Sequence, residues 1–356
     1  MPYKMTKRPN ADSTPAILGE ASVRAIKDLL QEGESANTRS SYQSALRYWQ
    51  AWHLLRYGEA MALPTDVAHV LQFIVDHAER QSATGLRSEL PETVDRALVQ
   101  GGHKARMGPL AHSTLVHRMA VLSKYHQAQG WPNPCQDPHV RELMSRTRKA
   151  YAKRGVLPQK KEALTKDVLT ALLATCDDSL RGKRDRALLL FAWASGGRRR
   201  SEVAQAEVRH LRQVAAGEYL YTLTHSKTNQ SGLDAPDNHK PVLGAAGAAL
   251  QDWLASAGIV EGAIFRRIRK GGHVGEPLSP AAVRTIVKDR CALAGVEGDF
   301  SAHSLRSGFV TEAGRRNVPL PETMALTGHH SVATVLGYFR AESALQNPAA
   351  RMMDDE

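Results

Sequence analysis

The chain has 356 residues, which suits about two domains. Its lysines and arginines outnumber its acidic residues by 11, and its isoelectric point is about 9.7. This surplus favours a polyanionic partner, nucleic acid first and an anionic membrane second, although charge alone leaves open a basic enzyme without such a partner. A hydrophobic content of 42% excludes a disordered chain.

The three cysteines, Cys135, Cys176 and Cys291, lie far apart in the sequence. No Cys-x-x-Cys and no paired Cys/His spacing accompanies them, so we expect neither a disulfide scaffold nor a metal site, and a reducing cytoplasm fits. The N-terminal stretch MPYKMTKRPNADSTPAIL has no continuous apolar core, and no run approaches about 18 apolar residues. The sequence therefore predicts a cytoplasmic protein with no membrane partner.

The first 150 residues read as a tail followed by helices. Residues 1–20 are predicted to be a flexible tail, and residues 21–152 a helical domain. In the segment 36–58, Tyr42, Leu46, Trp49 and Trp52 recur at helical spacing and form one apolar face. Further helices are expected over 65–77, 112–130 and 140–155.

A basic stretch follows the first domain. Residues 141–161 hold eight lysines and arginines and one acid, and Gly155 and Pro158 interrupt helix there. We interpret residues 153–164 as a basic interdomain linker, running along phosphates or simply solvated. Residues 165–340 are predicted to be a mainly helical second domain. One small β-sheet is expected in it over residues 218–243. Residues 341–356 are predicted to be a tail or a short helix.

Four short stretches of the second domain carry polar groups that a helical core does not need. In GGRRRSEVAQAEV, arginines crowd a junction between two helices, where they could grip a phosphate or form a solvated turn. Lys227 in HSKTN lies at the tip of a strand, where lysines are usually idle. In DFSAHSLRSGF, His303 and Arg306 share one helical face, as catalytic donors or as a surface pair. In TGHHSVATVLGYF, Tyr338 follows His329 by nine residues and could be a core residue or a nucleophile.

Together these groups suit phosphoryl transfer by a protein nucleophile. Arginines and histidines could neutralise the charge that builds on the non-bridging oxygens while a tyrosine attacks. A lysine is a fitting acid for the leaving 5′ oxygen. No carboxylate cluster supports two-metal chemistry, so neither a metal nor another cofactor is expected.

The order Arg-x-x-Glu, Lys on a hairpin, His-x-x-Arg, then Gly-His and a tyrosine nine residues on resembles the tyrosine recombinase (phage integrase) family, and it is Cre- or Xer-like in size. The resemblance covers nearly the whole chain, and the catalytic set it implies is Arg199, Glu202, Lys227, His303, Arg306, His329 and Tyr338. Arg198 and Arg200 flank Arg199 where the family usually has apolar residues, so Glu202 decides the register. His330 competes with His329 but lies only eight residues before the tyrosine.

The resemblance implies a two-domain, C-shaped clamp around duplex DNA, mainly α with a small sheet in the catalytic domain. The activity it implies is site-specific recombination through a 3′-phosphotyrosyl intermediate and a Holliday junction. A homotetramer on two DNA sites is implied, with the C-terminal tail docking on a neighbour. Such a protein is bacterial or phage-encoded and nucleoid-associated.

Two other functions stay open. A type IB topoisomerase or telomere resolvase uses the same tyrosine chemistry, and a helical DNA-binding protein would use none of it. The residues that contact DNA are not separable by sequence. The candidates lie on basic helix faces of both domains: Arg39, Arg47, His117, Arg118, Arg146, Arg148, Lys149, Arg284 and Lys288.

Overall fold

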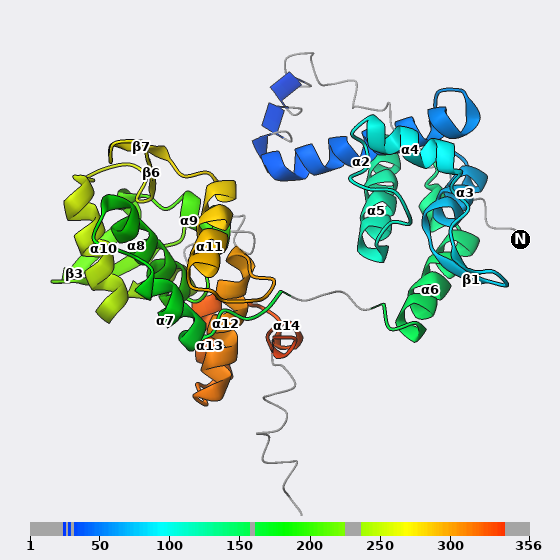
Figure 1. The fold of residues 1–356 in the computed structure, drawn as a ribbon. Helices are drawn as coiled ribbons and strands as arrows, with labels where there is room; N and C mark the ends of the chain where they lie inside the picture. The colour runs from blue at the N-terminus through cyan, green and yellow to red at the C-terminus, as the bar shows by residue number, and fades with distance from the viewer. Residues whose placement is uncertain (1–23, 26–27, 30–31, 157–160, 225–235, 339–356) are drawn as a thin grey trace, which may run out of the picture. The chain divides into compact units, whose positions relative to one another are not determined.

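The computed structural model describes residues 24–25, 28–29, 32–156, 161–224 and 236–338. Its chain separates into two compact units, Met1–Pro158 and Gln159–Glu356 (Figure 1). The predicted tails 1–20 and 341–356 lie outside the described residues, as does Lys227. Both units are mainly helical, and this confirms the predicted fold class.

The N-terminal unit is built of helices joined by short connections. Its helices are α2 (Ala36–Tyr57), α3 (Val67–His77), α4 (Glu92–Gln100), α5 (His112–Ala128) and α6 (Pro138–Lys153), with a 3₁₀ turn over Pro134–Gln136. A two-stranded antiparallel hairpin, β1 (Arg80–Ser82) with β2 (Gly85–Arg87), follows α3. Neither this hairpin nor α4 was predicted, because both segments are short and mostly polar.

Helix α2 begins and ends on capping residues. The Ser35 hydroxyl accepts a hydrogen bond from the N–H of Thr38, and Gly58 ends the helix in the left-handed conformation. The apolar face predicted for this helix is confirmed at Trp49 and Trp52, which are fully buried, whereas Tyr42 and Leu46 are only half-buried. The ring of Trp49 stacks on Phe73 of α3 with centroids 3.6 Å apart.

Two polar groups of α3 are buried in this core and fully partnered. The Asp76 carboxylate accepts hydrogen bonds from the Trp52 indole at 3.0 Å and from the Arg56 guanidinium at 3.1 Å. His77 donates a hydrogen bond from Nδ1 to the Phe73 carbonyl, so its Nε2 accepts a hydrogen bond from the Tyr48 hydroxyl at 2.7 Å. Burial lowers the pKa of His77 to about 3, which keeps the ring neutral.

The C-terminal unit combines helices with two small sheets. Its elements, in chain order, are α7 (Lys166–Ala174), α8 (Leu180–Ala194), α9 (Arg200–Ala204), β3 (Leu211–Ala215), β4 (Glu218–Thr222), β5 (His239–Val242), α10 (Gly244–Ala257), β6 (Arg266–Ile268), β7 (Val274–Pro277), α11 (Pro280–Leu293), α12 (Ala302–Arg315), α13 (Leu320–Thr327) and α14 (Val332–Leu336). Two 3₁₀ turns, Val208–His210 and Pro236–Asn238, precede β3 and β5.

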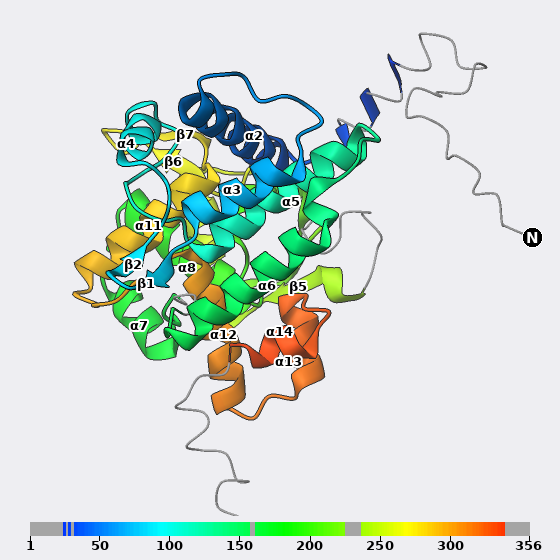
Figure 2. The same cartoon turned by 90° about the vertical axis from the view of Figure 1, so that its right-hand side faces the viewer.

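The sheet is larger than the sequence predicted. Strands β3, β4 and β5 pair antiparallel in that order, so the predicted hairpin over 218–243 gains a third strand before it. A separate hairpin, β6 with β7, closes over the turn at 269–273. Helix α8 is buried at the centre of the unit, with Leu188, Leu189 and Phe191 fully covered. Figures 1 and 2 show α12, α13 and α14 grouped together at one end of the unit.

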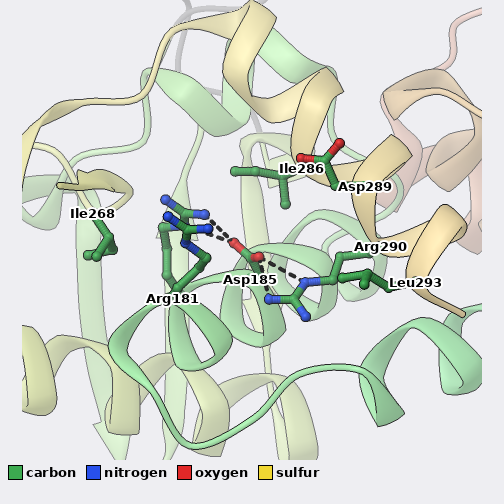
Figure 3. Close-up of a pocket in the computed structure, with 8 residues that line it drawn as sticks. Arg181, Asp185, Ile268, Ile286, Asp289, Arg290 and Leu293 are labelled. Carbon is green, nitrogen blue, oxygen red and sulfur yellow. Dashed lines mark hydrogen bonds and ion pairs between the residues drawn. The ribbon is translucent and has the colours of Figure 1, made fainter. Parts of the chain in front are cut away.

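A buried ion pair ties α8 to α11. One oxygen of the Asp185 carboxylate accepts two hydrogen bonds from the Arg290 guanidinium, at 2.7 and 2.9 Å (Figure 3). The other oxygen accepts hydrogen bonds from the Arg184 guanidinium. Arg290 also donates to the Thr175 carbonyl at the end of α7. All three charged groups are at least nine-tenths buried, so both arginines depend on Asp185 as their counter-charge.

Candidate active site

The centre of the site is one face of α12. Ser301 caps this helix, since its hydroxyl accepts the N–H of His303, and Ser304 returns a bond to the N–H of Ser301. His303 and Arg306 stand one turn apart on the helix, as predicted from their spacing. Arg306 is almost fully buried, whereas His303 is exposed on one side.

A glycine pair brings a second segment against α12. Gly196 and Gly197 end α8 with φ of +92° and +69°, a region that favours glycine. A Cβ on Gly197 would lie 2.3 Å from the Cα of Arg306, and one on Gly196 would lie 2.3 Å from the Leu326 carbonyl oxygen. This turn can therefore touch both α12 and α13 only because neither residue has a side chain.

Arg199 and Glu202 follow this turn. The N–H of Arg199 donates to one oxygen of Glu202 at 3.0 Å, and its guanidinium donates to the other at 2.6 Å. Burial alone would raise the pKa of Glu202, but the charges of Arg198 and Arg199 hold it below its usual value. The carboxylate is thus ionised and fixes the Arg199 side chain. This contact fits the choice of Arg199, rather than Arg198 or Arg200, as the arginine that precedes Glu202 by three residues.

His329 is held in one tautomer. Its Nε2 accepts the Nε–H of Arg306 at 3.3 Å, so the ring hydrogen lies on Nδ1 and is donated to the Thr327 hydroxyl at 2.7 Å. That hydroxyl in turn donates to the Thr323 carbonyl. Burial and the neighbouring charge of Arg306 lower the pKa of His329 to about 3, so the ring is neutral at pH 7.

Tyr338 lies in the same cluster. Its N–H bonds to the carbonyl of Val335, the one buried residue of α14, which anchors this short helix. The phenol oxygen lies 3.3 Å from Nε2 of His303. The ring centroid of Tyr338 lies 5.4 Å from that of His329 and 5.9 Å from that of His303. Tyr338 is therefore within side-chain reach of residues far away in the sequence.

Positive charge dominates the site. Three guanidinium groups, those of Arg198, Arg199 and Arg306, face one carboxylate, that of Glu202. Burial and the charges of the other two arginines lower the pKa of Arg306 to about 10. Its Nη2 is buried and has no hydrogen-bond partner among the described residues. A buried, unpaired donor in a cationic cluster suits an anionic ligand.

The structure brings together six of the seven residues assigned to catalysis: Arg199, Glu202, His303, Arg306, His329 and Tyr338. The seventh, Lys227, lies outside the described residues. His330 is exposed next to His329, and the hydrogen bond to Arg306 belongs to His329.

The nine candidate DNA contacts lie on four helices. Arg39 and Arg47 lie on α2, and His117 and Arg118 lie on α5. Helix α6 carries Arg146, Arg148 and Lys149, and α11 carries Arg284 and Lys288. Most of these side chains are exposed. The guanidinium of Arg118 instead lies 3.0 Å from the ring centroid of Tyr48, and His117 bonds to the Ser41 hydroxyl. Their roles stay predictions.

Sequence reasoning missed three residues that shape the site. Thr327 orients His329, and the buried cations Arg198 and Lys240 contact the end of α13. Arg198 carried a signal, because it is charged where an apolar residue is expected. Lys240 carried none, since β5 is too short for an alternation to predict which side chains face inward.

The described residues contain no cluster of three or more His, Cys, Asp or Glu side chains that could hold a metal ion. Nor do they contain a helix that is long and apolar enough to cross a membrane. The chemical groups of the site are a phenol, imidazoles and guanidiniums, with one carboxylate that holds Arg199. This is the set that phosphoryl transfer to a protein nucleophile uses.

Comparison with known proteins agrees with phosphoryl transfer to a protein nucleophile. The sequence pattern of the phage integrase family matches residues 162–344. The chain is 31% identical to an integrase/recombinase xerD homolog of Selenomonas ruminantium, over 68% of this chain and 72% of that one. It is 24% identical to recombinase cre of Escherichia phage P1, over 69% and 76% of the two chains.

Solved structures share the fold. A lambda integrase dimer bound to a COC′ core site matches with a TM-score of 0.51 and 17% identity, over 89% of this chain and 93% of that one. The chain therefore belongs to the phage integrase family, and it is a site-specific DNA recombinase of the tyrosine class.

Proposed function

We propose that this site cleaves one strand of duplex DNA with Tyr338 as the nucleophile. The observation that carries the proposal is the phenol oxygen of Tyr338, 3.3 Å from His303 in a cluster built around the buried Arg306. The phenol oxygen attacks phosphorus, the bond to the 5′ oxygen breaks, and a 3′-phosphotyrosyl bond remains. A free 5′ hydroxyl of a partner strand then reverses the reaction. Because one phosphodiester bond replaces another, no ATP is required.

The arginines stabilise the phosphate. Arg306 offers the buried Nη2–H that has no partner among the described residues, and Arg199 stands beside it, held by Glu202. Both donors are in place before the reaction, so they need no reorganisation as charge develops on the non-bridging oxygens.

His303 accepts the proton of the phenol. Burial and the charges of Arg306 and Arg199 lower the pKa of His303, so its ring is neutral at pH 7. In the tautomer with hydrogen on Nδ1, Nε2 receives the hydrogen bond of Tyr338 and then its proton. His329 holds Arg306 through its own Nε2. The histidines thus act first as acceptors rather than as the cations that the sequence suggested.

The leaving 5′ oxygen requires a proton donor. The family resemblance assigns this role to Lys227, and a lysine is the fitting acid on chemical grounds.

The protein acts on DNA as an assembly. A homotetramer on two sites exchanges strands through a Holliday junction. A neighbouring structure supports DNA as the partner, since it is a lambda integrase dimer bound to a core site. The exposed basic residues of α2, α6 and α11 supply phosphate contacts, which makes binding steeply salt-dependent. The protein works where bacterial or phage DNA is found, in the cytoplasm at the nucleoid.

A nicked suicide duplex carrying a site selected from random DNA tests the proposal. The nick lets the short 5′-ended fragment diffuse away, so the covalent complex accumulates and is counted on a denaturing gel. Wild-type protein is expected to attach, and Tyr338→Phe is expected not to. If the wild-type protein binds the site but never attaches, the proposal is wrong. Two-site recombination, as opposed to relaxation or hairpin formation, separates a recombinase from a topoisomerase or telomere resolvase.

A further inference from the structure

The C-terminal end of α13 is capped in an unusual way. Both N–H groups that follow the helix, those of Gly328 and His329, bond to the carbonyl of Met324. The carbonyls of Ala325 and Leu326 are met by side chains instead. Lys240 Nζ donates to Ala325 at 2.6 Å, and Arg198 Nη2 donates to Leu326 at 2.5 Å.

Both cations are almost entirely buried. Lys240 and Arg198 are each 1% exposed, a state that lysine and arginine rarely adopt without a carboxylate in direct contact. The acid paired with Arg198 is Glu202, with 3.7 Å between the charged atoms, and Arg198 Nε has no partner among the described residues. A helix C-terminus partly compensates, because its carbonyls carry negative partial charge. Burial of this kind is costly, so it calls for a reason beyond stability.

The two contacts link three separate parts of the site. Arg198 immediately precedes Arg199 in the glycine turn, and Lys240 belongs to β5 of the sheet. The carbonyls they hold lie one turn before His329, whose ring bonds to Arg306. The glycine turn lies close to the same carbonyl, since a Cβ added to Gly196 would lie 2.3 Å from the Leu326 oxygen. The end of α13 is thus fixed to the segment that carries Arg199, and it lies beside Arg306.

We propose that Arg198 and Lys240 are positioning residues for strand cleavage, which clamp the end of α13 and so set His329 against Arg306. This inference rests on the proposed function and adds to it two residues that touch neither the phosphate nor Tyr338. They act through His329. Without the clamp, the turn after α13 moves, and the Arg306 guanidinium loses the His329 Nε2 acceptor that orients it.

Lys240 adds a dependence on pH. Burial, with the positive charges of Arg198 and Arg306, lowers the pKa of Lys240 to about 7, against the opposing effect of the acids nearby. The ionisable groups around it are Arg198, Arg306, Asp237, Glu202 and its strand neighbour Tyr221. Its charge is therefore lost as pH rises through neutrality, and the neutral amine holds the Ala325 carbonyl less strongly.

The test compares Arg198→Met and Lys240→Met with Arg290→Met, which also removes a buried cation of the same unit but at the α8–α11 ion pair. Each is assayed by single-turnover cleavage of the suicide duplex at saturating protein, well below its melting temperature. We expect the first two variants to cleave roughly tenfold to hundredfold more slowly, the scale for misplaced catalytic groups, with little change in DNA affinity. Arg290→Met is expected to lower the melting temperature but to leave the cleavage rate near wild type.

Two readouts separate positioning from general damage. Nitrogen NMR of the His329 ring is expected to show the Nδ1–H tautomer in wild type and in Arg290→Met, and a mixture of tautomers in Arg198→Met. Lys240→Arg keeps its charge at every pH, so the ratio of its cleavage rate to that of wild type is expected to rise between pH 6 and pH 9.

The outcomes are distinct. If wild-type protein never attaches to DNA, the proposed function fails. If wild type attaches but Arg198→Met and Lys240→Met match Arg290→Met in rate and in tautomer, the clamp is only structural and the inference is wrong. A Lys240→Arg ratio that stays flat with pH contradicts the role of the lysine charge.

Discussion

Replacing Arg306 by lysine keeps the positive charge but removes the planar guanidinium with its several N–H donors. In the wild-type protein the guanidinium donates from Nε to His329 and from Nη1 to the Gly197 carbonyl, each at 3.3 Å, and Nη2 is left for the ligand. A lysine is a single point donor on a flexible stem and cannot satisfy three directions at once. Arg306→Lys therefore loses the donor to the phosphate or the contacts that aim it.

The expected cost follows from this geometry. Loss of one preorganised donor to a developing oxyanion slows a reaction by roughly 10²–10³-fold, or about 2.7–4 kcal/mol. The net charge of the site is unchanged, so long-range attraction of DNA should persist and the loss should fall on the cleavage step. We expect single-turnover cleavage to slow within that range while the dissociation constant changes only a few-fold.

The assay is covalent trapping on the nicked suicide duplex, with Arg316→Lys as the matched control. Arg316 follows the same helix but is exposed and pairs with Glu312, so its replacement should leave cleavage unchanged. Circular dichroism checks that both variants are folded. Cleavage by Arg306→Lys at a rate within a few-fold of the control would refute the assignment of Arg306 to the phosphate.

Three further predictions concern stability, measured by denaturant unfolding. Gly197→Ala should destabilise the protein by roughly 1–3 kcal/mol more than Gly258→Ala. Both glycines have positive φ, but only at Gly197 would a Cβ meet a neighbouring backbone. Equal losses of stability would contradict the close approach of Gly197 to Arg306. His77 has a folded pKa of about 3, so below pH 6.5 the unfolded chain binds a proton that the folded one does not. Lowering the pH from 7 to 5 should therefore cost about 2 kcal/mol through His77, and His77→Gln should remove that part of the acid sensitivity. Asp185→Asn should cost about 3–5 kcal/mol because it leaves two arginines without a counter-charge, and a loss under 1 kcal/mol would show that the pair is dispensable.

Sequence patterns predicted the parts of this protein that depend on local spacing. The apolar face of α2 follows from the recurrence of Trp49 and Trp52, and the pairing of His303 with Arg306 follows from one helical turn. The register at Arg199 followed from Glu202, and the structure joins those two residues by two hydrogen bonds. The overall order of motifs placed Tyr338 in the site by resemblance.

What sequence could not predict depends on contacts between distant segments. Nothing near Lys240 indicates that its amine reaches the end of α13, 85 residues later. The tautomer of His329 depends on Thr327 on one side and on Arg306 on the other, and only a folded arrangement brings these together. The short hairpins β1–β2 and β6–β7 were missed because three or four residues are too few to show an alternation.

The most direct test of the central claim is to identify the residue that carries the DNA. Wild-type protein trapped on the suicide duplex is digested with nuclease and trypsin, and the peptides are sequenced by mass spectrometry. A nucleotide is predicted on Tyr338, in the peptide spanning residues 317–340, and this adduct should be absent from Tyr338→Phe. A nucleotide on any other residue of the wild-type protein would contradict the account.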